Sequence, residues 1–208
     1  MKGIVFDLYN TLVQSPGFRN VTSVILPGIP HAEISKIIYA EAEGSSLAML
    51  TRLSKHFGVA RTNTELRKDV ALCTEWASER KFFPGTLETL RELRRRGFKL
   101  GLLSNTSELL DATLEANGIP KLLDHLVLSH LIRCQKPKEA AFRAIIEKME
   151  IKPQDLTMVG DILRVDIIPA NAIGMQGIQL SCPWEEQGEV TISQIEELLT
   201  LPQFQRPS

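Results

Sequence analysis

The strongest constraint on the fold of this chain is the regular alternation of strand-like and helix-like segments in its second half. From Phe83 onward, short apolar runs alternate with stretches in which apolar residues recur every three or four positions. Such alternation predicts a parallel sheet with helices on both faces. The predicted strands are residues 2–6, 99–103, 125–128, 156–159 and 177–180, and the predicted helices include 107–117, 140–149, 166–173 and 192–199. The expected fold class is therefore α/β, with a Rossmann-like parallel sheet as its core.

Residues 15–82 have a different pattern, because helical periodicity runs through them without strand-like segments. Four such segments are separated by Pro27-Gly28, Gly44 and Gly58. Thr62 or Asn63 is a candidate N-cap for the fourth helix. This pattern predicts an all-helical cap over residues 15–82, inserted into a core formed by residues 1–14 and 83–208. An insertion directly after the first strand lies over the C-terminal strand ends, where it can act as a lid.

The composition is ordinary for a soluble globular protein. With a net charge of −1, the bulk electrostatics do not favour nucleic acid or an anionic membrane as a partner. Cys73, Cys134 and Cys182 form no CxxC pair, so we expect free thiols rather than disulfides or a zinc site. No signal peptide precedes the first strand and no apolar run reaches about 18 residues. We therefore expect a cytoplasmic protein, either a monomer or a homodimer.

Residues with reactive or charged side chains follow four of the predicted strands. Asp7 directly follows the first strand, and a carboxylate at that point is costly to bury and seldom needed for folding. The other three segments are Ser104-Asn105-Thr106, Lys136-Pro137 and 160–166. Because the loops after parallel strands share one rim of the sheet, we expect these groups to converge there. An Asp at such a rim can serve as a nucleophile.

These blocks, in this order, resemble the motifs of the haloacid dehalogenase superfamily of phosphatases, phosphomutases and dehalogenases. The resemblance spans nearly the whole chain, and Phe83-Pro84-Gly85 leading into 100–105 is characteristic of members with a helical cap after the first motif. It implies that Asp7 is the nucleophile, which forms an acyl intermediate that water then hydrolyses. It also implies that Lys136 neutralises the nucleophile and the transferring group.

The resemblance further implies a site for the phosphoryl group of a substrate. Ser104 would hold a phosphoryl oxygen through its hydroxyl, with help from the backbone amide of Asn105. Tyr9 and Thr11, in the segment after the nucleophile, complete the expected substrate-binding set together with Lys136.

A Mg²⁺ site is also implied by the resemblance. Asp161 and the second oxygen of Asp7 would bind the ion, and Tyr9 would offer its backbone carbonyl, since Mg²⁺ takes hard oxygen ligands. Asp166 would either support the waters of the metal or pair with Lys136. A structural role for Asp166, as the cap of a helix that begins there, stays open beside these two.

Two sequence features favour different reactions within this superfamily. Phosphatases usually carry a second Asp two residues after the nucleophile as general acid and base, but this chain has Tyr9, whose phenol is a poor substitute. A Tyr there resembles the 2-haloacid dehalogenases, whose halide leaving group needs no proton. Asp161 and Asp166, in contrast, would repel Asp7 without a cation, whereas those dehalogenases work without metal.

We therefore expect a Mg²⁺-dependent phosphohydrolase that acts on a small phosphorylated molecule and favours good leaving groups. A metal-independent 2-haloacid dehalogenase and a binding protein with little turnover are the two alternatives.

Overall fold

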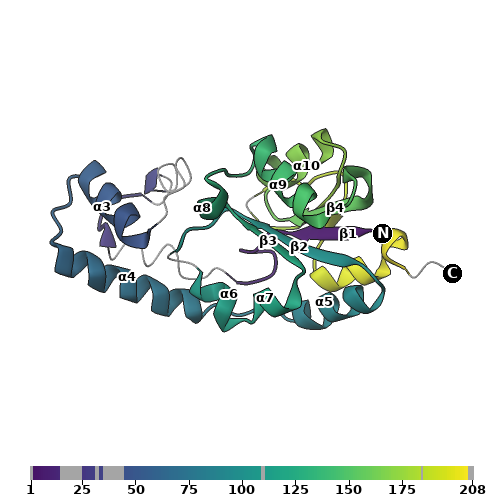
Figure 1. Cartoon of the computed structure of the whole chain (residues 1–208), viewed down its shortest axis with the longest axis horizontal. Helices are drawn as coiled ribbons and strands as arrows, with labels where there is room; N and C mark the ends of the chain where they lie inside the picture. The colour runs from purple at the N-terminus through teal and green to yellow at the C-terminus, as the bar shows by residue number, and fades with distance from the viewer. Residues whose placement is uncertain are drawn as a thin grey trace.

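A parallel sheet of six strands lies between layers of helices in the right-hand part of the molecule as viewed in Figure 1. The structure is a computed structural model that describes residues 2–14, 25–30, 33–34, 45–108, 111–183 and 185–205. The strands are β1 (Gly3–Phe6), β2 (Lys99–Ser104), β3 (His125–Leu128), β4 (Leu156–Gly160), β5 (Gln176–Leu180) and β6 (Thr191–Ile192). Their order is β3-β2-β1-β4-β5-β6, and every neighbouring pair is parallel. The predicted parallel α/β core is confirmed.

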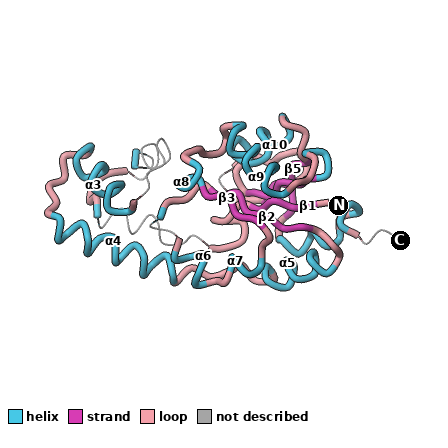
Figure 2. The backbone as a smooth tube through the Cα atoms, in the orientation of Figure 1, coloured by secondary structure: helices cyan, strands magenta, loops and turns pink. Residues whose placement is uncertain are grey.

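Helices cover both faces of this sheet (Figure 2). Ile4 and Phe6 pack on the face covered by α5 (Thr86–Arg95), α6 (Ala112–Ala116), α7 (Ile119–Leu122) and the 3₁₀ helices η4 (Ile195–Thr200) and η5 (Pro202–Phe204). Val5 packs on the opposite face, which α9 (Glu139–Met149) and α10 (Ile168–Ala172) cover. Successive strand residues point to opposite faces, so burial on both sides explains why these strands are apolar throughout.

A second apolar cluster lies outside the sheet, in the segment predicted to be a cap. It is built on α3 (Ser46–His56) and α4 (Asn63–Ser78). Thr62 caps α4 as predicted, in a capping box with Glu65. The predicted first two cap helices fall largely on residues 15–24 and 35–44, which lie outside the described residues. The separate cluster supports our proposal that residues 15–82 form a cap, and Figure 1 shows α3 standing apart from the sheet.

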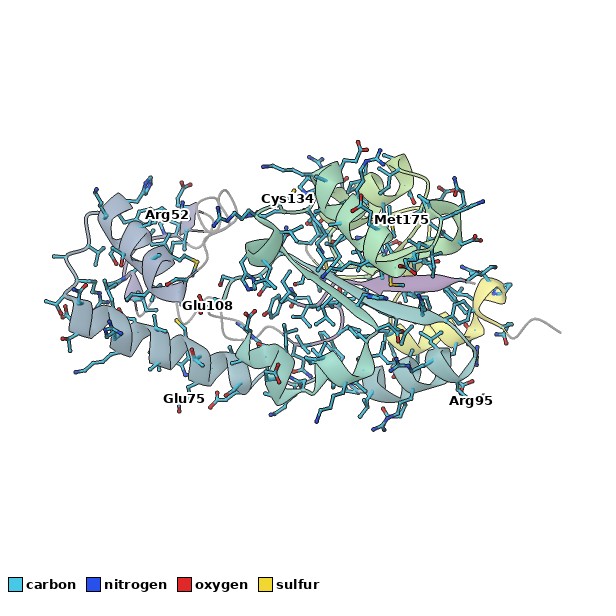
Figure 3. All side chains as sticks on the ribbon, viewed as in Figure 1. Arg52, Glu75, Arg95, Glu108, Cys134 and Met175 are labelled. Carbon is cyan, nitrogen blue, oxygen red and sulfur yellow. The ribbon has the colours of Figure 1, made fainter. Side chains whose placement is uncertain are left out.

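Three hydrogen bonds join the segment that we propose as a cap to residues that follow β2. The amide of Ser46 donates to Oε2 of Glu108 at 3.1 Å, and Glu108 is labelled in Figure 3. Thr113 Oγ1 donates to the carbonyl of Ala77 at 2.8 Å. Asn117 Nδ2 donates to the carbonyl of Arg80 at 2.8 Å. The end of α4 is therefore tied to α6, which follows β2.

The structure corrects the sequence prediction at the C-terminal end of the chain. The predicted helix 192–199 is wrong in its first part, because Thr191 and Ile192 form β6 and Ile192 pairs with Leu180. A 3₁₀ helix, η4, follows it. Two β-branched residues extend the sheet where the apolar periodicity suggested a helix. The tail is not frayed up to residue 205, since Phe204 is buried against Phe98.

The predicted helix 166–173 begins earlier than expected and is irregular. A π-helical turn, η3 (Leu163–Ile167), comes first, and α10 continues from it with Pro169 in its first turn. Single π turns are typical of functional sites. This turn carries Asp166, so the local distortion determines where that carboxylate points.

Among the described residues, none of the helices combines the length and the apolar character needed to cross a bilayer. The three cysteines are free, as predicted.

Candidate active site

Asp7 lies at the end of the central strand β1 and marks the middle of the site. Its amide donates to the carbonyl of Val159 at 2.8 Å, which extends the pairing of β1 with β4 by one residue. The residue is 8% exposed. The chain then turns back through Leu12, whose amide donates to the carbonyl of Leu8. The sheet therefore fixes the backbone of Asp7 and leaves its carboxylate at the rim.

Lys136 bridges two carboxylates that come from distant parts of the chain. Its Nζ lies 2.6 Å from Oδ1 of Asp7 and 2.6 Å from Oδ1 of Asp166. The backbone of Lys136 is held by Asn105, whose side-chain amide donates to its carbonyl and accepts from its amide, both at 2.8 Å. These two hydrogen bonds join the loops after β2 and β3. They fix the backbone from which the side chain of Lys136 extends toward the two carboxylates.

Asp161 and Asp166 complete an acidic cluster with Asp7. One carboxylate oxygen from each of the three lies within 4.8 Å of the others, and all three residues are buried. Asp166 Oδ2 accepts from the amide of Ile162 at 3.1 Å. Gly160 permits this approach, because a Cβ there would lie 2.5 Å from the carboxyl carbon of Asp166. The predicted convergence of these groups is what the structure shows.

Asp161 differs from the other two carboxylates because part of it has no partner. Its backbone carbonyl accepts from Nε2 of Gln179 at 3.1 Å, which fixes the loop after β4. Its Oδ2 is buried and has no hydrogen-bond partner. A buried carboxylate oxygen without a donor is costly, and a cation would satisfy it.

The electrostatics of the cluster show a shortage of positive charge. Burial raises the pKa of Asp7 to about 6, although Lys136 opposes the rise. Burial, together with the charges of Asp7 and Asp166, raises the pKa of Asp161 to about 8. Burial also disfavours the ammonium of Lys136, but Asp166 and Asp7 outweigh it and hold the pKa of Lys136 above its usual range. Three carboxylates around one ammonium leave a formal charge of −2 when all are ionised.

The residues present fit a Mg²⁺ ion. Mg²⁺ prefers oxygen ligands, usually keeps several waters and takes one or two carboxylates from the protein. Asp7 and Asp161 offer such oxygens, and the formal charge of the cluster matches a divalent ion. Asp166 pairs with Lys136, one of its expected roles, and it lies inside η3 rather than at a helix N-cap. The capping hypothesis for Asp166 is therefore wrong.

The expected substrate-binding hydroxyls lie on the segments that follow β1 and end β2. Ser104 ends β2 with its Oγ buried and unpartnered, and Thr11 Oγ1 is likewise buried and unpartnered. Unpaired buried hydroxyls are uncommon, so both are available to a ligand. Tyr9 is half-buried, and its hydroxyl lies 3.4 Å from Oγ1 of Thr106. The side chain of Asn105 serves to hold Lys136, a structural role that the sequence did not suggest.

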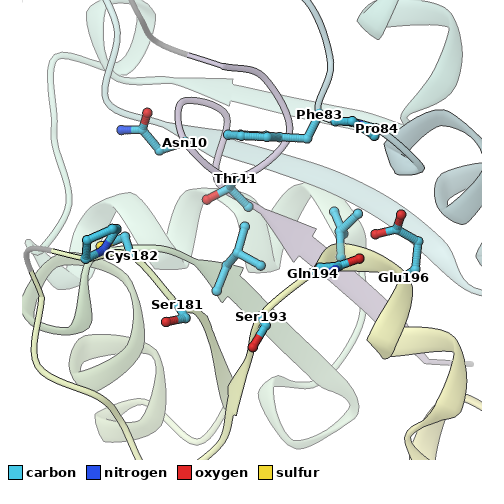
Figure 4. A pocket seen from close by; sticks show the side chains of 12 residues that line it. Asn10, Thr11, Phe83, Pro84, Ser181, Cys182, Ser193, Gln194 and Glu196 are labelled. Atoms are coloured by element: carbon cyan, nitrogen blue, oxygen red, sulfur yellow. The ribbon is translucent and has the colours of Figure 1, made fainter.

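A pocket of about 440 Å³ opens next to the segment after the nucleophile (Figure 4). Asn10 and Thr11 form one wall, and Ser181 and Cys182 after β5 form another. The thiol of Cys182 lies 3.7 Å from the carbonyl of Asp161. The pocket therefore borders the loops that carry Asp7 and Asp161.

Two further groups near the rim were not identified from the sequence as part of the site. His130 is buried in α8 (Ser129–Ile132), and its Nε2 lies 3.1 Å from Oδ2 of Asp111. Arg80 is buried at the end of α4, with its guanidinium 5.0 Å from the centre of the Tyr9 ring. Neither residue belongs to one of the sequence motifs or lies at a fixed spacing from them, so the sequence did not indicate that either is near the site.

Comparison with known proteins agrees with this architecture. The sequence profile of the haloacid dehalogenase-like hydrolases matches residues 1–174. Phosphoglycolate phosphatase 1 of Pseudomonas aeruginosa is 27% identical over 94% of this chain and 78% of its own. A glyceraldehyde 3-phosphate phosphatase of Methanothermobacter thermautotrophicus is 28% identical over 86% of this chain and 84% of its own. The chain spans only 56% of the ribulose-1,5-bisphosphate 5-phosphatase of Halopiger xanaduensis, with 30% identity over 64% of this chain.

Solved structures share the fold at lower identity. A HAD phosphatase from Thermococcus onnurineus superposes with a TM-score of 0.70 at 22% identity, over the whole of both chains. A 2-haloacid dehalogenase from Pseudomonas syringae gives 0.72 at 18% identity, over 96% of this chain and 97% of its own. These likenesses establish the fold and do not separate the two reactions. With the family profile covering most of its length, the chain belongs to the haloacid dehalogenase-like hydrolases.

Proposed function

We propose that this protein is a Mg²⁺-dependent phosphohydrolase that acts on a small phosphorylated metabolite through a phosphoaspartate on Asp7. The observation that carries the proposal is the buried cluster of Asp7, Asp161 and Asp166 around a single ammonium, with Oδ2 of Asp161 unpartnered. Such a cluster is suited to a divalent cation and to a phosphoryl group, whose charge needs neutralising. The phosphatases among the curated relatives support the same substrate class.

In this proposal Asp7 supplies the nucleophile. A carboxylate oxygen of Asp7 forms a bond to phosphorus while the bond from phosphorus to the leaving oxygen breaks. Water then attacks phosphorus, which restores the carboxylate and releases inorganic phosphate. Lys136, 2.6 Å from Asp7 Oδ1, holds the carboxylate in place and offers positive charge to the phosphoryl oxygens. The free hydroxyls of Ser104 and Thr11 are the donors available to those oxygens.

Asp7 and Asp161 are the residues that would hold Mg²⁺, and we propose the backbone carbonyl of Tyr9 as a third ligand. When bound, the ion supplies charge that stabilises the transferring phosphoryl group. Asp166 keeps Lys136 aligned and charged through their contact at 2.6 Å.

The leaving group limits the substrates that this site can handle well. Tyr9 stands where phosphatases of this superfamily usually carry the Asp that protonates the leaving oxygen. Acid–base assistance is worth about 10²–10⁴-fold, and a phenol near pKa 10 supplies less of it than a carboxyl group. We therefore expect faster turnover of acyl and aryl phosphates than of simple alkyl phosphates.

The test is hydrolysis of p-nitrophenyl phosphate and acetyl phosphate with and without Mg²⁺. We expect turnover that needs Mg²⁺ and disappears in Asp7→Asn. Undiminished activity in excess chelator would contradict the metal assignment. Absence of turnover for every phosphate ester tried would favour the binding protein with little turnover.

A 2-haloacid dehalogenase is the second candidate, and Tyr9 is the observation that favours it. A chloride leaving group needs no proton, so a Tyr in place of the acid–base Asp would not slow this reaction. The test is chloride release from 2-chloropropionate in chelator. No release at high enzyme concentration eliminates this candidate.

A further inference from the structure

Arg80 is a buried cation whose charge no acidic group in the described part of the chain neutralises. Its side chain is at the boundary between cap and core, and the residue is 5% exposed. Nε and Nη1 are buried without any hydrogen-bond partner. The guanidinium lies over the face of the Tyr9 ring, with its central carbon 5.0 Å from the ring centre.

The burial of this unpaired charge is unfavourable for the folded protein when no ligand is bound. A buried guanidinium is normally paired with a carboxylate or with several carbonyls, because its loss of hydration is otherwise uncompensated. The cation–π contact recovers only part of that cost. The backbone of Arg80 is secured separately, since its carbonyl accepts from Asn117. This backbone contact therefore does not depend on the guanidinium.

The position of Arg80 connects it with the reaction centre. Tyr9 is two residues from Asp7, which limits the distance between their Cα atoms to about 7 Å. The hydroxyl of Tyr9 lies 3.4 Å from Thr106, which is two residues after Ser104. Arg80 thus lies beside the segment that flanks the phosphoryl site, on the side where the cap joins the core.

We propose that Arg80 is a specificity residue that pairs with a second anionic group on the substrate, in addition to the phosphoryl group at Asp7. The inference rests on the proposed phosphohydrolase function and narrows its substrate class to phosphate esters that carry a carboxylate or another anionic group. The guanidinium keeps Nε and Nη1 free, so it can offer unused N–H donors and a full positive charge to a carboxylate. No hydrogen bond from Nε or Nη1 holds the side chain against the Tyr9 ring, so these two donors can turn toward such a group.

The test compares two esters that differ in one group, 3-phosphoglycerate with a carboxylate and glycerol 3-phosphate with a hydroxymethyl group. Hydrolysis and thermal stabilisation by each ester are measured with Mg²⁺ for wild type, Arg80→Lys and Arg80→Met. We expect wild type to prefer 3-phosphoglycerate. Arg80→Met should lose roughly ten- to a hundred-fold in kcat/KM for that ester and little for the other, with Arg80→Lys in between.

A second measurement separates recognition from structure. Because Arg80→Met removes an unpaired buried charge, its Tm without ligand should equal or exceed that of wild type. Arg91→Met, an exposed arginine on α5, is the control and should change neither the preference nor the Tm. If Arg80→Met is poorly folded, Arg80→Lys carries the comparison.

Equal losses for both esters, or an unchanged preference, would overturn the role of Arg80. Absence of Mg²⁺-dependent hydrolysis of p-nitrophenyl phosphate and acetyl phosphate by wild type would instead count against the proposed function. The thermal shifts remain informative in that case, because they report the contact of Arg80 with the carboxylate without turnover.

Discussion

Replacing Asp161 by Asn tests the charge balance of the cluster most directly. In the unfolded chain this carboxyl ionises near pKa 3.8, whereas in the folded chain burial raises its pKa to about 8. Below pH 3.8 the carboxyl group of Asp161 is protonated in both the folded and the unfolded state, so it does not change the free energy of unfolding. As the pH rises toward 8, the folded state keeps a proton that the unfolded state has lost, so the stability of the metal-free protein falls.

The magnitude follows from this difference. Between pH 3.8 and 7 each pH unit lowers the free energy of unfolding of the metal-free protein by about 1.4 kcal/mol. The upper limit of the loss at pH 7 is therefore about 4 kcal/mol. Adjustment of the site around Lys136 lowers this cost, so we expect about 2–4 kcal/mol. Asn has the same shape without the ionisation. Asp161→Asn should therefore raise the Tm in chelator at pH 7 by about 5–15 °C, since 1 kcal/mol corresponds to about 2–4 °C for a chain of this size.

The assay is thermal unfolding in chelator and in Mg²⁺ at several pH values. The advantage of Asp161→Asn should be near zero at pH 4 and largest above pH 8. Mg²⁺ at about a hundred times its Kd should stabilise wild type by about 2.7 kcal/mol and the variant far less. Asp155→Asn, an exposed carboxylate just before β4, is the matched control and should behave as wild type.

Two results would refute this reasoning. One is an Asp161→Asn protein that is less stable than wild type in chelator at pH 8. The other is full stabilisation of the variant by Mg²⁺, which would place the ion elsewhere.

Three further predictions concern Tyr9, Lys136 and Cys73. Tyr9→Asp should accelerate Mg²⁺-dependent hydrolysis of alkyl phosphates by at least about tenfold, because it adds a carboxyl group for the leaving oxygen; a slower variant in steady-state assays would contradict our interpretation of Tyr9. Lys136→Met should abolish turnover and lower stability by about 3–5 kcal/mol in denaturant titrations, since it leaves Asp7 and Asp166 buried without a cation; retained activity would remove Lys136 from the mechanism. Burial raises the pKa of Cys73 to about 12, so mass spectrometry after iodoacetamide at pH 8 should show labels on Cys134 and Cys182 and none on Cys73 until the protein is unfolded.

The convergence of the reactive groups was predictable because it follows from topology. Asp7, Lys136 and Asp161 are far apart in sequence, but each follows a strand, and parallel strands place their C-terminal ends at one rim. The Thr62 capping box was predictable for a similar reason, since it depends on local chemistry alone. Neither inference needed the positions of distant side chains.

The parts that the sequence did not predict depend on tertiary contacts. β6 has only two residues, so its pairing with β5 leaves almost no pattern in the sequence. The π turn η3 carries Asp166, whose contacts are with Lys136 from a distant loop and with the amide of Ile162, and the local sequence does not indicate these contacts. The site of Arg80 depends on how α4 meets the core, and no motif near residue 80 indicates that geometry.

The hydrogen bonds between Asn105 and Lys136 bear on how substrate range could change while the reactive groups stay the same. Both loops belong to the core, as do Asp7, Asp161 and Asp166, so within the described residues the acidic cluster takes no side chain from the segment 15–82. If that segment, which carries Arg80, is the cap that we propose, exchanging it would leave the side chains of the acidic cluster in place. A chimera that keeps this core and receives a foreign lid should retain its chemistry and acquire a new substrate range.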